Sequence, residues 1–177
     1  SGDSKEAFRV LQLARKGGID VQAVEALIQE GPQRPREVEV GDLVQQAEAY
    51  YRTGAYDTAR ELLERAAEQD PREAQVHYWL GRVALEEESE DQARGHFQRS
   101  LELDPDFLRS RYELGRLAYG DEDYARAVSW LEPCVEGGSA DSSAHFMLGR
   151  SRFELGDFPE AEELLRTAIR NRSDYGN

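Results

Sequence analysis

Apolar and polar residues alternate in this chain with the period of an α-helix, in pairs of short segments separated by turns. From about residue 40 onward, each segment is about a dozen residues long and carries one apolar face. Glycine turns at residues 53–56 and 155–158 separate the two segments of a pair. Residues 120–124 are a looser version of that turn, and acidic residues replace it at 86–91. The pattern predicts antiparallel helix pairs joined by short turns.

The helix pairs repeat with a period of 34 residues. Alanine stands at residues 59, 93, 127 and 161, and Leu-Gly-Arg recurs at 80–82, 114–116 and 148–150. Asp-Pro at 70–71 and 104–105 ends successive pairs. The period divides the chain without gaps into units at about 40–73, 74–107, 108–141 and 142–175. Such a period is typical of helix pairs stacked on one another and not of a single globular core.

The repeated positions resemble the tetratricopeptide repeat (TPR), whose pattern is W-x2-L-G-x2-Y, then A-x3-F, then P. The second unit matches at residues 80–81, 93, 97 and 105. His77, Arg111 and His145 replace the tryptophan of the pattern, and serine replaces its proline at 139 and 173. We expect packing roles for the two histidines. The resemblance covers about three quarters of the chain. It implies an all-α, right-handed solenoid of four TPR units.

Two columns of the repeat predict how the helices of a unit meet. Small residues at 47, 81, 115 and 149 let the first helix approach the second. Larger residues at 63, 97, 131 and 165 fill the space between them. Cys134 stands in a column of small residues and is expected to be buried. Pro133 falls late in a predicted helix, which we expect to kink or end early.

The two ends of the chain differ from the repeats. Ser4 and Asp20 are candidate N-caps, and Gly17-Gly18 and Gly31 are candidate stops, so residues 4–31 predict a non-repeat helical hairpin. The predicted organisation is a hairpin and loop at 1–36 and a TPR domain at 40–177. No polar capping helix follows the last repeat. We therefore expect its apolar face to lie partly bare, which favours truncation or self-association; this face comprises Leu164, Leu165, Ala168 and Ile169.

Charge and composition narrow the classes of function. The chain is 39% apolar and 33% charged, with a net charge of −14, which disfavours nucleic acid and anionic membranes as partners. No apolar run approaches the ~20 residues of a membrane span. One cysteine excludes an internal disulfide. Phosphate loops, metal-spaced His/Cys clusters and nucleophile motifs are absent. We predict a non-enzymatic protein without cofactor or metal, and favour a cytoplasmic location.

Candidate binding residues lie on the first helix of each unit. Residues four and seven positions beyond a starting residue share one helix face. In the first unit that face begins at Val44 and Glu48. The candidate partner-binding residues on this face are Tyr51; Tyr78, Arg82 and Leu85; Arg109, Tyr112, Arg116 and Tyr119; and Phe146, Arg150 and Phe153. In TPR proteins this face lines the concave groove, as the resemblance implies. Stacking then aligns Arg82, Arg116 and Arg150 in a row.

A row of three guanidinium groups repels itself, and a ligand that brings carboxylates or carbonyls relieves the repulsion. The preferred partner is therefore an acidic, apolar-punctuated peptide or helix of another protein. Alternatively, Glu86, Glu113 and Glu154 pair with the arginines. The carboxylate clamp of TPR co-chaperones for Hsp70 and Hsp90 is absent. Its positions read Val44, Glu48, Trp79, Arg109 and Glu113.

Three other functions remain open at this point. A folded partner, for example a small GTPase, can dock on the solenoid. Copies of the chain can assemble through the exposed ends of the solenoid. The chain can also be a regulatory domain of a larger protein, since it begins Ser1-Gly2 without methionine and is interpreted as a processed or excised fragment.

Overall fold

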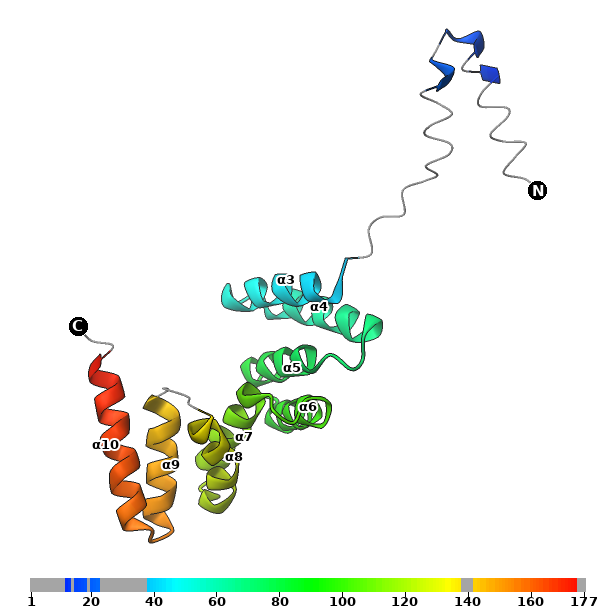
Figure 1. Ribbon diagram of the computed structural model, residues 1–177. Coiled ribbons are helices and arrows are strands. Elements are labelled where there is room, and N and C mark those ends of the chain that lie inside the picture. Colours follow the sequence, from blue (N-terminus) through cyan, green and yellow to red (C-terminus); the bar gives the residue numbers. More distant parts are fainter. Residues whose placement is uncertain (1–11, 14, 19, 23–37, 138–141, 175–177) are drawn as a thin grey trace. The chain divides into compact units, whose positions relative to one another are not determined.

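The computed structural model describes residues 12–13, 15–18, 20–22, 38–137 and 142–174 (Figure 1). The contacts divide the chain into two units, residues 1–38 and 39–177. In the first unit Gly18 has a φ of +68°, and Asp20 Oδ1 accepts a hydrogen bond of 2.9 Å from the Gln22 amide, as an N-cap does. The other predicted cap and stop of the hairpin, Ser4 and Gly31, lie outside the described residues.

The described residues of the second unit form eight helices in four antiparallel pairs (Figure 1). These are α3 (Val40–Arg52) with α4 (Tyr56–Gln69), α5 (Ala74–Glu86) with α6 (Glu90–Leu103), α7 (Leu108–Gly120) with α8 (Tyr124–Glu136), and α9 (Ser142–Glu154) with α10 (Phe158–Asp174). Each pair packs on the next, α4 on α5, α6 on α7 and α8 on α9. First helices also touch directly, α3 with α5 and α7 with α9. The predicted all-α solenoid is confirmed.

Every turn within a pair has the same backbone conformation. Gly54, Glu88, Glu122 and Gly156 stand 34 residues apart and have φ angles of +80°, +58°, +62° and +91°. Each turn is closed by an amide that bonds back to a carbonyl of the first helix, for example Asp123 N to Ala118 O at 2.9 Å. The turn at 120–124 is therefore no looser than the others, because Glu122 adopts the left-handed conformation that glycine adopts elsewhere.

The two helices of a pair touch where the repeat places glycine. A Cβ on Gly81 would lie 2.6 Å from the Phe97 ring, and one on Gly115 would lie 2.5 Å from Leu131 Cγ. Gly149 approaches Leu165 in the same way, at 2.9 Å. Phe97 and Leu131 have no exposed surface. The predicted roles of the small and large columns are confirmed.

Pro133 does not end its helix, which continues to Glu136. Proline removes one backbone donor from the helix. The carbonyl of Pro133 still accepts a 3.0 Å hydrogen bond from Gly137 N. Counted along the repeat, the helix ends only one residue earlier than α4 and α6, which end at Gln69 and Leu103, and the expected kink stays a prediction.

The residues that replace tryptophan hold the loops between units. His77 Nε2 lies 3.4 Å from the carbonyl oxygen of Pro71, and Arg111 Nη2 donates to that of Pro105 at 2.7 Å. The His77 ring also stacks on the His96 ring, with 5.9 Å between centroids. His145 is buried. The packing roles expected for these histidines are confirmed.

The contact of Gly115 with Leu131 predicts a stability change. Gly115→Ala should lower the free energy of unfolding by about 1–3 kcal/mol, because the added methyl group overlaps Leu131. Gly95→Ala is the matched control: Gly95 is an exposed residue of α6 with no heavy atom within 4 Å of an added Cβ. It should gain about 0.5–1 kcal/mol. Urea unfolding measures both. Equal effects of the two substitutions would contradict the close approach.

His96 predicts a pH dependence of stability. Burial, helped by the nearby charges of His77 and Arg60, lowers the pKa of His96 below its ordinary value. The unfolded histidine titrates near pH ~6.5 and so binds a proton that the folded one excludes. Stability should therefore fall as the pH drops below about 6.5. His96→Gln should flatten this dependence in urea titrations run on both sides of that pH. An unchanged pH profile in the variant would contradict the role of His96.

Candidate functional site

The predicted binding face lies on α3, α5, α7 and α9, and its exposure varies along the stack. Tyr78 is buried, whereas Phe146 and Phe153 are 48% and 46% exposed. Arg109 is also exposed. The remaining predicted residues are half-buried: Tyr51, Arg82, Leu85, Tyr112, Arg116, Tyr119 and Arg150.

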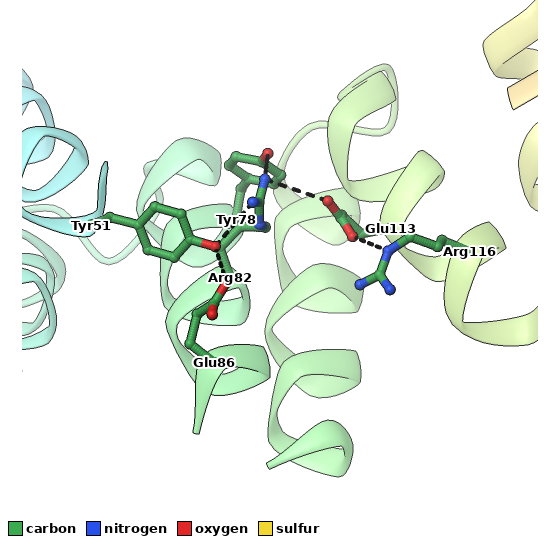
Figure 2. Close-up of polar contacts among 6 residues, drawn as sticks. All are labelled: Tyr51, Tyr78, Arg82, Glu86, Glu113 and Arg116. Atoms are coloured by element: carbon green, nitrogen blue, oxygen red, sulfur yellow. Dashed lines mark hydrogen bonds and ion pairs between the residues drawn. The ribbon is translucent and has the colours of Figure 1, made fainter. Parts of the chain in front are cut away.

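Arg82 is held by side chains from three successive units (Figure 2). Its Nη2 donates to the Tyr51 hydroxyl at 2.9 Å, and its Nη1 donates to the Tyr78 hydroxyl at 3.0 Å. The guanidinium carbon lies 5.1 Å from the centroid of the Tyr51 ring. The Tyr51 hydroxyl in turn donates to Glu86 Oε1 at 2.6 Å. These contacts fix Arg82 and join α3 to α5.

Glu113 is the counter-ion shared by two of the predicted arginines (Figure 2). Its Oε2 accepts a 2.9 Å hydrogen bond from Arg116 Nε, and its Oε1 lies 3.5 Å from Arg82 Nη1. The Glu113 side chain is only 8% exposed, so water screens it little. Arg116 engages it through Nε, and no described residue bonds to either of its Nη atoms. One carboxylate thus bridges neighbouring arginines.

The predicted binding role of the arginine row required guanidinium groups without internal counter-ions. The structure instead gives Arg82 and Arg116 a carboxylate partner within the chain. Arg150 Nη2 also has an internal partner, Glu154 Oε1, at 2.9 Å. The alternative pairing is correct for Glu113 and Glu154, because both lie within one helical turn of their arginines. It is incorrect for Glu86, whose hydrogen-bond donor is Tyr51.

The protonation equilibria follow from these contacts. Burial and the hydrogen bond to Glu86 raise the pKa of Tyr51 to about 12. The Tyr51 hydroxyl holds the pKa of Glu86 below its ordinary value. Burial alone would lower the pKa of Arg82, but the hydrogen bond to Tyr78 and the charge of Glu113 raise it overall. The tyrosine therefore stays a neutral donor beside an ionised carboxylate near neutral pH.

One pocket brings four predicted residues together, and we call it the charged pocket. It has a volume of ≈ 300 Å³, and its lining contains Tyr78, Arg82, Leu108, Arg109, Tyr112, Glu113 and Cys134. Arg109 has no hydrogen-bond or ion-pair partner among the described residues. Cys134 is buried as expected, and burial raises the pKa of its thiol. The pocket thus combines an immobilised arginine, an available arginine and one buried carboxylate.

A second pocket, the end pocket, lies between α9 and α10. It has a volume of ≈ 410 Å³ and is lined by Ser142, Ser143, Phe146, Met147, Ala168, Ile169 and Arg172. Ile169 is 71% exposed, whereas Ala168 is buried. Leu164 and Leu165 are half-buried, so the apolar face of the last helix is partly bare, as expected.

The other predicted residues make contacts outside these two pockets. The Tyr119 ring meets the Tyr124 ring at 6.1 Å, and the Phe153 ring meets the Phe158 ring at 5.3 Å. Leu85 is half-buried on α5. Sequence reasoning missed Leu108 of the charged pocket and Met147 and Ile169 of the end pocket as site residues. The 34-residue period contains a signal for Met147, since it is the counterpart of Glu113.

The described residues contain no group of three or more His, Cys, Asp or Glu side chains placed to hold a metal ion. None of their helices is long and apolar enough to cross a membrane. The predicted binding face presents arginine and aromatic side chains, which suit the recognition of carboxylates and apolar side chains.

Comparison with known protein families gives one match. A sequence profile described as tetratricopeptide repeat matches residues 44–106, 91–142 and 112–176, in three overlapping segments. A search of curated proteins gives no significant match to the sequence.

Solved structures of MamA share the fold. A crystal structure of MamA has a TM-score of 0.66 at 19% identity, over 80% of this chain and 82% of that chain. One structure of MamA AMB-1 has a TM-score of 0.64 at 25% identity, over 76% of this chain and 73% of that one. Another has a TM-score of 0.65 at 25% identity, over 74% and 77%. These similarities agree with an all-α helical solenoid.

The shared ion pair predicts a loss of stability on removal of its carboxylate. Glu113→Gln should lower the free energy of unfolding by about 1–3 kcal/mol, because two arginines lose a buried counter-ion. Glu102→Gln is the matched control, since Glu102 pairs with Arg99 at the same helical spacing but on an exposed surface. Its effect should stay within about 0.5 kcal/mol. Urea unfolding at constant m-value measures both. Equal losses would contradict the shared role of Glu113.

Proposed function

The chain belongs to the tetratricopeptide repeat family, and we propose that it is a non-catalytic scaffold whose charged pocket binds a carboxylate from an acidic, apolar-punctuated segment of a partner protein. The observation that carries this proposal is Arg109, an exposed arginine that lines the pocket without an internal partner among the described residues. A guanidinium group binds a carboxylate through two parallel hydrogen bonds, which gives both strength and orientation.

The local charge balance supports an anionic ligand. The lining of the charged pocket contains two arginines, Arg82 and Arg109, and one carboxylate, that of Glu113, so the pocket itself carries an excess of positive charge. The whole chain has a net charge of −14. An acidic segment is therefore repelled by most of the surface and attracted to this region, which favours encounter at the pocket.

Three arginines on this part of the binding face have different roles in the proposal. Arg82 is bonded to Tyr51 and Tyr78 and faces Glu113, so it shapes the pocket and adds charge without moving. Arg109 contacts the ligand directly. Arg116 keeps its Nε on Glu113 and has both Nη atoms available to a second carboxylate. Binding then requires no rupture of an internal ion pair.

Selection from a random peptide library displayed on phage tests the proposal, with the whole chain as bait. Peptides enriched on the wild type should contain more Asp and Glu than the starting library. A synthetic peptide of the enriched sequence should bind Arg109→Gln about tenfold more weakly, because a hydrogen bond between charged groups contributes about 1.5–3 kcal/mol. Fluorescence polarisation measures this difference.

Arg99→Gln provides the matched control for that measurement. Arg99 is an exposed arginine of α6, paired with Glu102 and outside the binding face. Its variant has the same change in net charge as Arg109→Gln and should bind the peptide as the wild type does. Enriched peptides without an excess of acidic residues would refute the proposal, and so would equal weakening by the two variants.

A further inference from the structure

The charged pocket and the end pocket occupy the same place in successive repeats. Adding 34 to the residue numbers of five of the seven residues in the first lining produces five of the seven in the second. Leu108, Arg109, Tyr112, Glu113 and Cys134 correspond in this way to Ser142, Ser143, Phe146, Met147 and Ala168. The two pockets therefore share one site on equivalent helix pairs, α7 with α8 and α9 with α10, and the charged pocket is completed by Tyr78 and Arg82 of α5.

Two substitutions between the copies remove charge, and Arg172 is the one charged residue in the lining of the end pocket. Serine stands at 143 where the charged pocket has Arg109, and Met147 stands where it has Glu113. Phe146 replaces Tyr112 and so lacks a hydroxyl group. The end pocket also exposes apolar surface, since Phe146 is 48% and Ile169 71% exposed. Large apolar side chains exposed beside a concave surface are typical of a binding site for an apolar group.

We propose that the end pocket binds an apolar side chain of the same partner segment whose carboxylate occupies the charged pocket. This inference rests on the proposed function. The two pockets then form a two-position reader, with an anionic position on α7 and an apolar position on α9. The partner segment has one direction, because reversing it would place a leucine or phenylalanine beside the charged groups of Arg82, Arg109 and Glu113.

The repeat also sets the spacing between the two recognised residues. α7 and α9 are in contact, and contacting helices lie roughly 8–10 Å apart. An extended chain advances about 3.3 Å per residue. An acidic residue in the charged pocket therefore places the residue about three positions away over the end pocket. The segment expected is extended, with an acidic and an apolar residue about three positions apart.

The test is a set of parallel selections from the same displayed library. Wild type should enrich peptides that carry both the acidic and the apolar residue at this spacing. Ile169→Gln should keep the acidic preference and lose the apolar one, and the wild-type peptide should bind it about tenfold more weakly, as expected for loss of a buried apolar contact. Ile169 is largely exposed, so this substitution should leave the fold intact. Leu155→Gln is the matched control: Leu155 is 48% exposed and lies outside both pockets.

Ser143→Arg tests the equivalence of the pockets by a gain of specificity. It places on α9 the residue that Arg109 supplies on α7. Peptides selected on this variant should carry a second acidic residue where wild type selects an apolar one. A change of preference of this kind does not arise from a loss of folding.

The outcomes separate this inference from the proposed function. An acidic preference without an apolar one, or an apolar preference that survives Ile169→Gln and Ser143→Arg, overturns the inference and leaves the proposed function standing. An apolar preference lost equally in Ile169→Gln and Leu155→Gln also overturns it. Absence of any acidic preference refutes both.

Discussion

The structure depends on one contact that recurs in every repeat from the second onward: a glycine of the first helix lies against a large side chain of the second. Gly81 meets Phe97, Gly115 meets Leu131 and Gly149 meets Leu165, each at a separation that leaves no room for a Cβ. This close approach fixes the rotation of the first helix, because only one face can present the glycine. The opposite face is thereby presented away from the pair. The positions of Arg82, Arg116 and Arg150 follow from the glycine that precedes each of them.

Stacking brings arginines of successive units close together, where their positive charges repel. The buried carboxylate of Glu113 offsets this repulsion. Repeated arginines approach each other as the helices stack, and Glu113 lies between two of them. Tyr51 and Tyr78 then fix the geometry of Arg82 by hydrogen bonds to its Nη atoms. Because these contacts cross from α3 to α7, they also tie three repeats together. The same network leaves Arg109 outside, so the charged pocket has one guanidinium group without an internal partner among the described residues.

The fold could be predicted from sequence because its determinants are periodic. A period of 34 residues specifies which small residues face which large ones, and the contacts of Gly115 and Leu131 follow. The site could be predicted only in part. The pairing of Glu113 with Arg116 follows from their spacing along one helix, but its second contact, with Arg82, arises from the distance between two helices. The turn at residues 120–124 was predicted to be looser because it has no glycine at position 122. The place of Glu122 in the repeat, equivalent to Gly54 and Gly156, was the better guide to its left-handed conformation.

Repeat proteins are well suited to reading a linear sequence, since each unit offers the next position of the same site with its own side chains. In this chain the third and fourth units use that freedom in opposite ways. Glu113 and Arg109 make one copy of the pocket charged, whereas Met147 and Ser143 leave the following copy with Arg172 as its one charged residue. A scaffold built from identical units would bind a segment in several registers. Two unlike neighbouring pockets remove that ambiguity, because each shift by one unit places a charge against apolar surface.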